Sequence, residues 1–580
     1  MNSMNKTGKA SIDRPWLQHY PSALLENIRM PICTLRKYMH YNAPGLDSVA
    51  IHYYGNNILW KDIFDQADAC ARSFRALGFG EGSQIPVFLR SVPEFIYLLL
   101  AAEKIGASLL CRDNTLSENV EAVVKARART IIAHDFLTME EKMAYMQAGV
   151  KKIVLVSPCN LCKRSDMPEY IQKSLEANYT DTPASGEGIM SWQDFLQAGN
   201  NYHGIVELSA DIDRPLYRCY TSGSTGPSKQ VIHSARTLIG VMAQMNFYGG
   251  EIDHQPTWMV TILPPALVAV VVSMMLLPLV SQKLLILNPW VDVYDIDLEL
   301  MRYKPNNWPM IPMFIEVLMK SKRIPADYDM SHLLAIGAGA EACNNTQIKH
   351  VNAFLKKHNC RVPFTTGYGS SEAGSNVTFH ISGRPAGNGN VGCPMPLTTV
   401  AIFKPGTFQE LDYGQEGEIC IHGPGVMLGY DNKEATEKAL IRHPDGIIWL
   451  HMGDIGHMDE EGHIYTVGRG SNKRFGGGFL DILPMENLLA DADIPGVVDE
   501  FFVNVPDPEH EGYQEPFLYV VLKQGYTVED IKPHVFEALE PHMRPVKIIQ
   551  LYERPFWHFK TNRIGLMNAV IEERANGGSR

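Results

Sequence analysis

A run of hydroxyl residues, glycines and one lysine near the middle of the chain has the composition of a phosphate-binding loop. The segment reads YTSGSTGPSK over residues 220–229. Gly223 and Gly226 allow neighbouring backbone N–H groups to turn toward an anion, and Lys229 brings a charge for phosphate oxygens. Hydroxyl donors come from Thr221, Ser222, Ser224 and Thr225. The lysine stands three residues after Gly226, a spacing that argues against a Walker-type ATPase or kinase, and strand-like residues on both sides argue against a flexible Ser/Gly linker.

This loop resembles the phosphate loop of the acyl-adenylate-forming superfamily, which contains acyl- and aryl-CoA synthetases, peptide-synthetase adenylation domains and beetle luciferases. The family form is closer to YTSGSTG-x-PKG, and the lysine keeps its place in this chain. Further segments are similar to later motifs of the family: IGAGAE at 336–341, GYGSSE at 367–372, GEI at 417–419 with GY at 429–430, HMGD at 451–454 and GR at 468–469. Six motifs in the order of the family make the resemblance specific.

The resemblance implies an ATP site with Mg²⁺. Tyr368 offers a flat ring for adenine, and Glu372 offers a carboxylate for the Mg²⁺ that screens the triphosphate. Asp454 can accept from the two ribose hydroxyls, and Arg469 can reach ribose or phosphate as a fixed cation. Lys229 and Glu372 are expected to be catalytic. The resemblance also implies that Thr225 contacts both the metal and the nucleotide. The other positions implied for the nucleotide are Thr221, Ser222, Gly223, Ser224, Gly226, Gly339, Ala340, Glu341, Gly367, Gly369, Ser370 and Ser371.

The reaction implied by the family is activation of a carboxylic acid. The carboxylate attacks the α-phosphorus of ATP and pyrophosphate leaves, which gives an acyl-AMP. The protein forms no covalent bond in this step, so it contributes alignment and neutralises charge on phosphate oxygens. A well-placed cation lowers such a barrier by roughly 3–4 kcal/mol. Coenzyme A is the expected acceptor of the acyl group.

The segment expected to line the acid pocket departs from the family. Many acyl-CoA synthetases have L-P-x-x-H here, whereas this chain has Leu267 at the histidine position. Residues 266–275 also lack the aspartate with which amino-acid-activating domains hold an α-ammonium group. An apolar wall would leave that ammonium buried and unpaired, at a cost of several kcal/mol. We therefore expect an apolar acid, in a pocket that includes Ala266, Leu267, Val270 and Gly337.

The C-terminal motif departs further. The family ends in T-x-x-G-K-x-x-R, whose lysine reaches the α-phosphate, and this chain has HFKTNRIGL over residues 558–566. Alignment on the flanks places Arg563 at the lysine position, whereas Lys560 is the nearest lysine. Either residue can supply the catalytic cation. The hinge position, usually Asp or Lys, is Asn472.

The length of 580 residues predicts at least two domains. Alternating helical and β-rich stretches over residues 90–210 predict an α/β fold with mixed or mostly parallel sheets, and glycine-broken strands over 390–470 predict a β-rich subdomain. Strands are expected at 130–133, 152–156, 283–287, 333–336, 362–366, 399–403, 418–422, 447–450 and 463–467. Glycines at 468–478 predict a hinge between an adenylation domain at 1–470 and a small mobile α+β lid domain at 471–580.

Composition narrows the class of protein. The net charge of −12 argues against a general affinity for nucleic acid, and the N-terminal residues contain no secretion signal. The apolar run at 259–280 is split by Pro264 and Pro265, which favours a buried helix ending before Pro278 over a membrane span. Cys159 and Cys162 form a lone C-x-x-C, typical of reduced thiols rather than zinc. A cytoplasmic protein is expected.

Three functions remain open from the sequence. The first is an acyl- or aryl-CoA synthetase, favoured because no carrier-like segment follows the last motif. The second is a stand-alone adenylating enzyme that loads a separate carrier protein. The third is a nucleotide-binding protein without catalysis, suggested by the altered C-terminal motif. The acid itself and the oligomeric state do not follow from the sequence.

Overall fold

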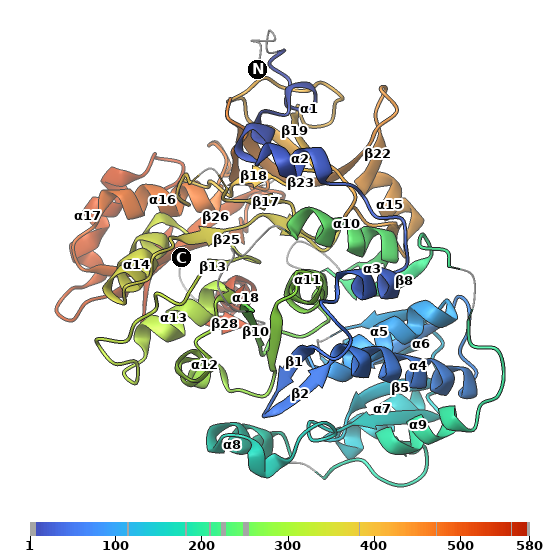
Figure 1. Ribbon diagram of the computed structural model, residues 1–580. Helices are drawn as coiled ribbons and strands as arrows, with labels where there is room; N and C mark the ends of the chain where they lie inside the picture. The colour runs from blue at the N-terminus through green and yellow to red at the C-terminus, as the bar shows by residue number, and fades with distance from the viewer. Residues whose placement is uncertain are drawn as a thin grey trace.

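The computed structural model describes residues 7–112, 115–179, 182–207, 210–221, 228–246, 255–381, 383–470, 472–557 and 560–576. Two large α/β layers form the main body, a β-rich part lies against them, and the C-terminal elements form a smaller unit (Figure 1). The α/β fold class expected from the alternation of helices and strands is confirmed.

One sheet contains the strands around the phosphate loop. Within the described residues it has eight strands, in the order β21-β9-β8-β4-β3-β5-β6-β7. The strands from β8 to β7 in this order pair in parallel, whereas β9 pairs antiparallel with both β8 and β21. The bounds are β3 Gln84–Phe88, β4 Ser108–Cys111, β5 Thr130–His134, β6 Lys152–Val156, β7 Ile189–Ser191, β8 Pro215–Tyr220, β9 Gln230–Ser234 and β21 Gly429–Tyr430.

The second sheet contains the strand that leads into the Gly/Ala loop. Its described strands run in the order β14-β13-β12-β10-β11-β1-β2, parallel throughout except for the β1–β2 hairpin. The bounds are β1 Val49–Tyr53, β2 Asn56–Leu59, β10 Thr257–Thr261, β11 Leu284–Asn288, β12 Asn307–Met310, β13 Ala335–Ala338 and β14 Phe364–Thr366. Parallel sheets of this kind are covered by helices on both faces, and their strands are correspondingly apolar.

Helices join the two sheets through one continuous apolar core. α5 packs on β4 and β8, α11 packs on β11, and α3 contacts both of these helices as well as α10. The bounds are α1 Ala10–Asp13, η1 Pro15–His19, α2 Ser22–Asn27, α3 Leu35–Asn42, α4 Trp60–Ala76, α5 Pro93–Ile105, α6 Leu116–Lys125, α7 Met139–Gln147, η2 Arg164–Asp166, α8 Glu169–Asn178, α9 Trp192–Asn200, α10 Ala235–Met245, η3 Val270–Leu276, α11 Leu277–Val280, η4 Val293–Asp295, α12 Ile296–Tyr303, α13 Pro312–Lys320 and α14 Asn345–Lys357.

Local sequence explains where several of these helices begin. Thr115 and Glu118 form a capping box at the start of α6, and Thr138 and Glu141 form another at the start of α7. In each box the threonine hydroxyl accepts from the N–H of the third helical residue, and the glutamate accepts from the N–H of the threonine. Both helices therefore begin where the capping signal stands in the sequence.

The long apolar run at 259–280 divides into a strand and a helix. Its first residues belong to β10, and its last form the π-helical turn η3 followed by α11. The expectation that the helix ends before Pro278 is wrong, because Pro278 lies inside α11. The N–H of Leu277 donates to the carbonyl of Val272, a five-residue step that lets the chain enter α11 through a widened turn. None of the described helices is both long and apolar enough to cross a bilayer.

The β-rich part is antiparallel. Its described strands follow the order β19-β20-β23-β22, with β24 paired to β23, and two short hairpins lie beside them. The bounds are β15 Gly369–Ser370, β16 Ser375–Asn376, β17 Thr378–Phe379, β18 Cys393–Pro394, β19 Thr399–Phe403, β20 Gly417–His422, α15 Lys433–Ala439, β22 Leu440–Arg442, β23 Ile448–Met458 and β24 Ile464–Gly468. The β-rich subdomain expected at 390–470 is confirmed. The N-terminal helices α1 and α2 lie against it (Figure 1).

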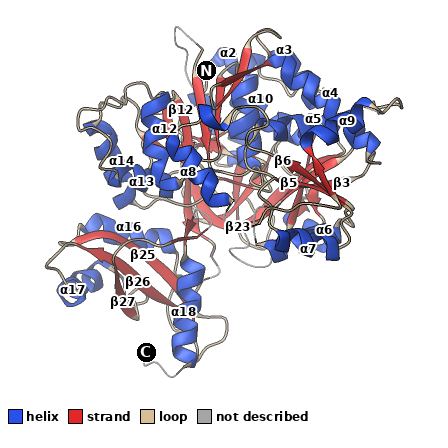
Figure 2. Cartoon of the chain, turned by 90° about the horizontal axis from the view of Figure 1, so that it is seen from below, coloured by secondary structure: helices blue, strands red, loops and turns tan. Residues whose placement is uncertain are grey.

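The C-terminal elements form a small α+β unit beside the main body (Figure 2). Its described elements are α16 Ile482–Ala492, β25 Val497–Pro506, β26 Gln514–Leu522, α17 Val528–Ala538, β27 Lys547–Leu551, β28 Phe556–Trp557, β29 Lys560–Thr561 and α18 Arg563–Ala575. Two apolar clusters within 480–570 contain no residue of the large core. A boundary at 470/471 and a mobile lid stay predictions.

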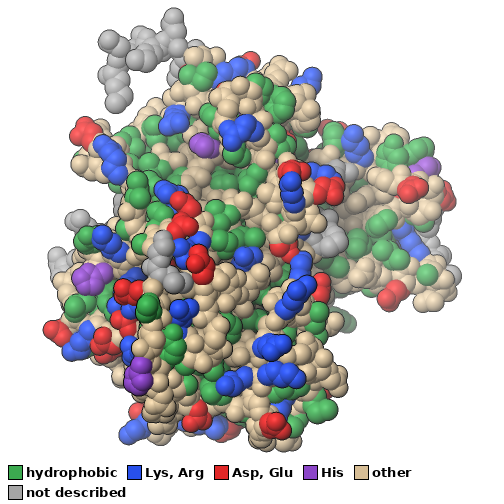
Figure 3. Space-filling model, turned by 90° about the vertical axis from the view of Figure 1, so that its right-hand side faces the viewer, with side chains coloured by type: hydrophobic (Ala, Val, Ile, Leu, Met, Phe, Trp, Pro, Cys, Tyr) green, Lys and Arg blue, Asp and Glu red, His purple; other side chains and the backbone are tan. Residues whose placement is uncertain are grey.

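The surface carries charge of both signs. On the face shown in Figure 3, Lys and Arg side chains lie among Asp and Glu side chains. Among the described residues, this face therefore carries no broad basic surface.

Candidate active site

The sheet around β9 brings Lys229 beside Tyr430. Residues 222–227 of the phosphate loop, and the site residues predicted among them, lie outside the described residues. At the base of the loop the N–H of Thr221 donates to the Lys229 carbonyl at 2.9 Å, and the N–H of Lys229 donates to Oγ1 of Thr221 at 3.0 Å. Tyr430 pairs with Val231 across β21 and β9. The Lys229 Nζ then lies 5.0 Å from the centroid of the Tyr430 ring.

The same tyrosine connects the lysine with the predicted metal ligand. The Tyr430 hydroxyl donates to Oε1 of Glu372 at 2.7 Å. Burial, together with the neighbouring Glu372 charge, raises the pKa of Tyr430 well above its usual range, so the hydroxyl stays a donor. The N–H of Met427 donates to the backbone carbonyl of Glu372 at 2.8 Å, which fixes the backbone of Glu372. A half-buried carboxylate held in this way fits a hard cation such as Mg²⁺. The sequence marked Tyr430 only as part of a motif.

A second group joins the aromatic element to the predicted ribose site. The Tyr368 hydroxyl donates to Oδ2 of Asp454 at 2.8 Å, and Nε of Arg469 lies 3.0 Å from Oδ1 of the same carboxylate. Burial raises the pKa of Asp454, while the Arg469 charge and the Tyr368 hydroxyl oppose that shift. Tyr368, Asp454 and Arg469, which the sequence predicted as separate site residues, therefore form one network.

The Gly/Ala loop leaves the carboxyl end of β13. A Cβ added to Gly337 would lie 2.5 Å from Oγ1 of Thr365 on the neighbouring strand β14. Only glycine therefore fits here without displacing Thr365. Ala340 has a φ of 71°, a left-handed conformation that residues other than glycine rarely adopt. Gly339, by contrast, faces open space. The loop ends at Glu341, whose carboxylate points to the C-terminal unit.

Glu341 is held by the C-terminal unit on both oxygens. Nη1 of Arg563 is paired with Oε1, and the N–H of Thr561 donates to Oε2 at 3.0 Å. Burial alone would raise the pKa of Glu341, but Arg563 and the Thr561 hydrogen bonds outweigh it and lower the pKa. Nη2 of Arg563 also contacts Oε1 of Glu486 at 3.0 Å. The guanidinium of Arg563 is thus neutralised by two carboxylates.

Lys560 is placed differently from Arg563. It lies in β29, whose hairpin with β28 is set by the pair Trp557 and Lys560. Burial lowers the pKa of the Lys560 ammonium; the negative charge of Glu341 opposes this shift and the positive charge of Arg469 adds to it. The charges of Glu341 and Arg469 therefore both act on this lysine.

The serines of the GYGSSE segment have structural contacts. Oγ of Ser370 accepts from the N–H of Ala373 at 3.1 Å and lies 3.0 Å from the sulfur of Met452. The carbonyl of Ser371 accepts from Nε2 of His233 at 2.8 Å. These bonds fix the loop that carries Glu372. Gly367 precedes Tyr368, and Gly369 begins β15 in a position where a Cβ would lie 2.0 Å from the Ser375 carbonyl oxygen.

The four residues predicted for the acid pocket differ in exposure. Leu267 is 38% exposed and Ala266 is half-buried, whereas Val270 is fully buried in η3. Gly337 packs on β14. Their common role as a pocket stays a prediction.

Comparison with known proteins agrees with this arrangement. The AMP-binding enzyme family matches residues 40–431, and the chain belongs to that family. It is 24% identical over 543 residues to a long-chain-fatty-acid–CoA ligase of Bacillus subtilis, covering 93% of this chain and 94% of that one. It is 25% identical to 4-coumarate–CoA ligase 2 of Nicotiana tabacum, covering 81% and 82%. The solved structure of ATP-bound MatB from Rhodopseudomonas palustris superposes with a TM-score of 0.75 at 19% identity, covering 93% of this chain and 99% of MatB.

Proposed function

We propose that this protein is an ATP-dependent ligase that converts an apolar carboxylic acid to its acyl-AMP and then to the coenzyme A thioester. The observation that carries the proposal is that side chains predicted for the site from distant parts of the sequence lie together in three groups. These are the Lys229–Tyr430–Glu372 series, the Tyr368–Asp454–Arg469 network, and the cations of the C-terminal unit. Membership of the AMP-binding family and relatives named as CoA ligases support it.

In the first step the acid's carboxylate attacks the α-phosphorus and pyrophosphate departs. Asp454 would accept from the ribose hydroxyls, and Arg469 would hold Asp454 ionised against its burial. Lys229 would bind phosphate oxygens from the rim of the loop. The protein's contribution is to hold both reactants in line and to place cations where charge develops.

Mg²⁺ would be held by Glu372. The metal supplies charge neutralisation on the triphosphate. The Tyr430 hydrogen bond fixes one oxygen of this carboxylate, which orients the other, as partners of ligating carboxylates commonly do. Thr225, the second predicted ligand, lies outside the described residues.

We assign the catalytic cation of the C-terminal unit to Lys560 rather than Arg563. Arg563 is already paired with Glu341 and Glu486, and this pairing leaves little net charge for phosphate. Among the described residues, the charges that act on Lys560 are those of Glu341 and Arg469, so its ammonium is not shared between two carboxylates. Arg563 then serves to dock the unit against the Gly/Ala loop.

The apolar character of the acid rests on the wall at 266–275. This segment contains no carboxylate that could pair with an α-ammonium group. The relatives named for long-chain fatty acids and for 4-coumarate are consistent with such an acid. A carrier protein as acceptor is the alternative, and we propose the cytoplasm as the location, in keeping with ten free thiols.

Pyrophosphate exchange tests the proposal. Wild-type protein is incubated with ATP, labelled pyrophosphate and, one at a time, fatty acids, hydroxycinnamic and benzoic acids, and α-amino acids. We expect exchange with one of the apolar classes and none with amino acids, followed by thioester formation on addition of coenzyme A. Thioester formed only on a phosphopantetheinylated carrier would favour the alternative acceptor.

A matched pair of variants locates the chemistry. Glu372→Gln should lower exchange about 10²-fold or more, in line with loss of charge stabilisation, without changing the melting temperature. Glu437→Gln, an exposed glutamate on α15, should leave exchange unchanged. Exchange that requires no acid, or that survives Glu372→Gln at full rate, would overturn the assignment.

A further inference from the structure

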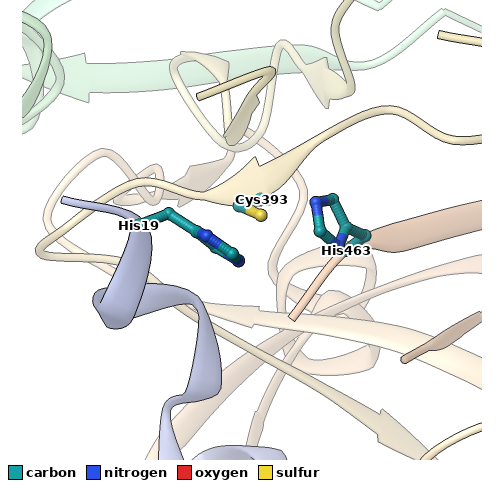
Figure 4. Close-up of side chains that lie close together, drawn as sticks. All are labelled: His19, Cys393 and His463. Carbon is teal, nitrogen blue, oxygen red and sulfur yellow. The ribbon is translucent and has the colours of Figure 1, made fainter. Parts of the chain in front are cut away.

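A group of three metal-ligating side chains lies outside the proposed active site. The sulfur of Cys393 and one ring nitrogen each from His19 and His463 all lie within 4.8 Å of one another. Figure 4 shows the sulfur between the two imidazole rings, with the three side chains coming from separate segments of the chain. None of the sequence motifs includes these residues.

The N-terminal segment is fixed where it presents His19. η1 ends at His19, and Trp16 in the same turn is fully buried. A Cβ at Gly462 would lie 2.5 Å from the Trp16 backbone nitrogen, and Gly462 has a φ of +91°, so glycine lets the two segments touch. The Tyr20 hydroxyl donates to the Pro394 carbonyl at 2.9 Å, next to Cys393. His19 is thus held close to the strand that carries the thiol.

Backbone pairing holds the other two ligands side by side. The N–H of Ile464 donates to the carbonyl of Gly392 at 2.9 Å, and the N–H of Val391 donates to the carbonyl of Ile464 at 2.9 Å. Cys393 directly follows Gly392 and His463 directly precedes Ile464, and both side chains are buried. His19 is half-buried, which leaves an approach to the group from its side.

Each imidazole is oriented through its other ring nitrogen. Nε2 of His19 lies 2.9 Å from the carbonyl oxygen of Glu461, which can only accept, so Nε2 carries the proton and Nδ1 the lone pair. Nδ1 of His463 lies 3.3 Å from the carboxylate of Asp459, which orients this ring. A carbonyl or carboxylate behind the imidazole is the usual support of a metal-bound histidine.

Cys393 fits a cation rather than a free thiolate. Its side chain is fully buried, where an unpaired thiolate would be poorly solvated. A bound metal ion displaces the thiol proton and pairs with the thiolate. Donors around a tetrahedral zinc ion lie about 3.3–3.8 Å apart, so the three groups need to close by little more than 1 Å.

We propose that His19, Cys393 and His463 form a site for a borderline-soft divalent cation of the Zn²⁺ class, with water as fourth ligand. Two imidazoles and one thiolate favour zinc over calcium or magnesium. The ion ties the N-terminal segment to the β-rich part, a structural role that does not depend on the reaction proposed above.

A second cluster supplies the control. Glu418, Cys420 and His451 also lie within 4.8 Å of one another. Here, however, Nδ1 of His451 is shared between the Glu418 carboxylate at 3.0 Å and the Cys420 sulfur at 3.3 Å, and its Nε2 lies 2.9 Å from His443. The donors satisfy one another in a closed hydrogen-bond network. Cys420→Ser therefore removes a comparable buried thiol without touching the proposed site.

Cobalt binding to the full-length, chelator-treated protein tests the proposal. Co²⁺ should bind with one equivalent and give the near-ultraviolet thiolate-to-cobalt absorption and the visible bands of a tetrahedral ion, and Zn²⁺ should displace it. These bands should persist in Cys420→Ser and disappear in Cys393→Ser. Their absence from the wild type, their survival in Cys393→Ser or their loss in Cys420→Ser would each refute the site.

His19→Ala keeps the test independent of folding at the buried positions. His19 is half-buried at the end of a short helix, so the variant should fold. It should bind Co²⁺ about 10–100-fold more weakly and lose the rise in melting temperature that Zn²⁺ gives the wild type. Equal affinity and equal thermal stabilisation in His19→Ala and wild type would contradict a ligand role for His19.

Discussion

Lys560 and Arg563 stand three residues apart and have different electrostatic surroundings. Arg563 is balanced by Glu341 and Glu486, whereas Lys560 is buried near Glu341 and the like charge of Arg469. Sequence spacing alone left the two exchangeable. The contacts separate a docking residue from a candidate catalytic cation, because a guanidinium with two carboxylate partners has little field left for a phosphate.

The residue-scale prediction follows from this contrast. Lys560→Ala should lower acid-dependent pyrophosphate exchange about 10²-fold or more, as loss of a transition-state cation does, while thioester formation from pre-made acyl-AMP survives. Arg563→Ala should have the smaller effect on exchange. The reverse ranking would transfer the cationic role to Arg563, and normal exchange in both would remove it from the C-terminal unit.

The pH profile offers a further readout of the same prediction. Adenylation needs the protonated ammonium of Lys560, whose pKa is lowered by burial. Activity should therefore fall on the alkaline side at a lower pH than an ordinary lysine would give. Lys560→Arg should retain exchange at reduced rate and move this alkaline limb upward, since a guanidinium keeps its proton. An unchanged limb would show that another group titrates.

At the scale of elements, the position of the Gly/Ala loop depends on the close packing of β13 on β14. The carboxyl ends of parallel strands form the site, as is usual in α/β sheets. Gly337 allows the two strands to approach each other, because a Cβ at this position would collide with Thr365. The sequence suggested Gly337 as a pocket residue, and the structure gives it a packing reason that holds with or without a ligand.

We expect Gly337→Ala to lower the free energy of unfolding by about 1–3 kcal/mol, the cost of overpacking a well-packed interior. Gly339→Ala is the matched control, because a Cβ at Gly339 meets nothing within 4 Å, and its stability should change by less than about 0.5 kcal/mol. Urea denaturation monitored by tryptophan fluorescence measures both. Equal stability of the two variants would show that β13 and β14 can separate without cost.

At the scale of the whole molecule, the C-terminal unit is docked on the Gly/Ala loop and on α14. The N–H of Asn345 donates to Oδ1 of Asn487 at 2.9 Å, and the Thr346 hydroxyl donates to Oε1 of Glu500 at 2.7 Å. These polar contacts, together with the Arg563 pairs, leave the apolar cores of the two parts separate. Interfaces of this polar kind permit domains to move.

The proposed movement predicts that the two half-reactions can be uncoupled. Asn472→Pro fixes a backbone dihedral in the glycine-rich connection, so pyrophosphate exchange should be largely kept and thioester formation depressed. Asn472→Ala removes the same side chain but leaves the backbone free, and it should support both steps. Equal loss of both steps in Asn472→Pro would argue against a hinge at this position.

The sequence by itself determined the class of fold and the order of the nucleotide motifs. Strand runs such as 130–133 and 399–403 and the hydroxyl-rich loop are local signals, so periodicity and composition revealed them. The same locality explains the error at Pro278. Pro278 lies in the first turn of α11, where the missing N–H of a proline is tolerated, and the widened turn of η3 leads into that helix.

Tertiary structure decided which distant residues meet. Tyr430 reaches Lys229 because β21 pairs with β9, and Arg563 reaches Glu341 because the C-terminal unit docks on the Gly/Ala loop. His19 meets His463 in the same way, across a contact that a glycine permits. Such meetings depend on the packing of whole elements, and the hydrophobic effect that drives this packing carries no direction that a local sequence pattern could record.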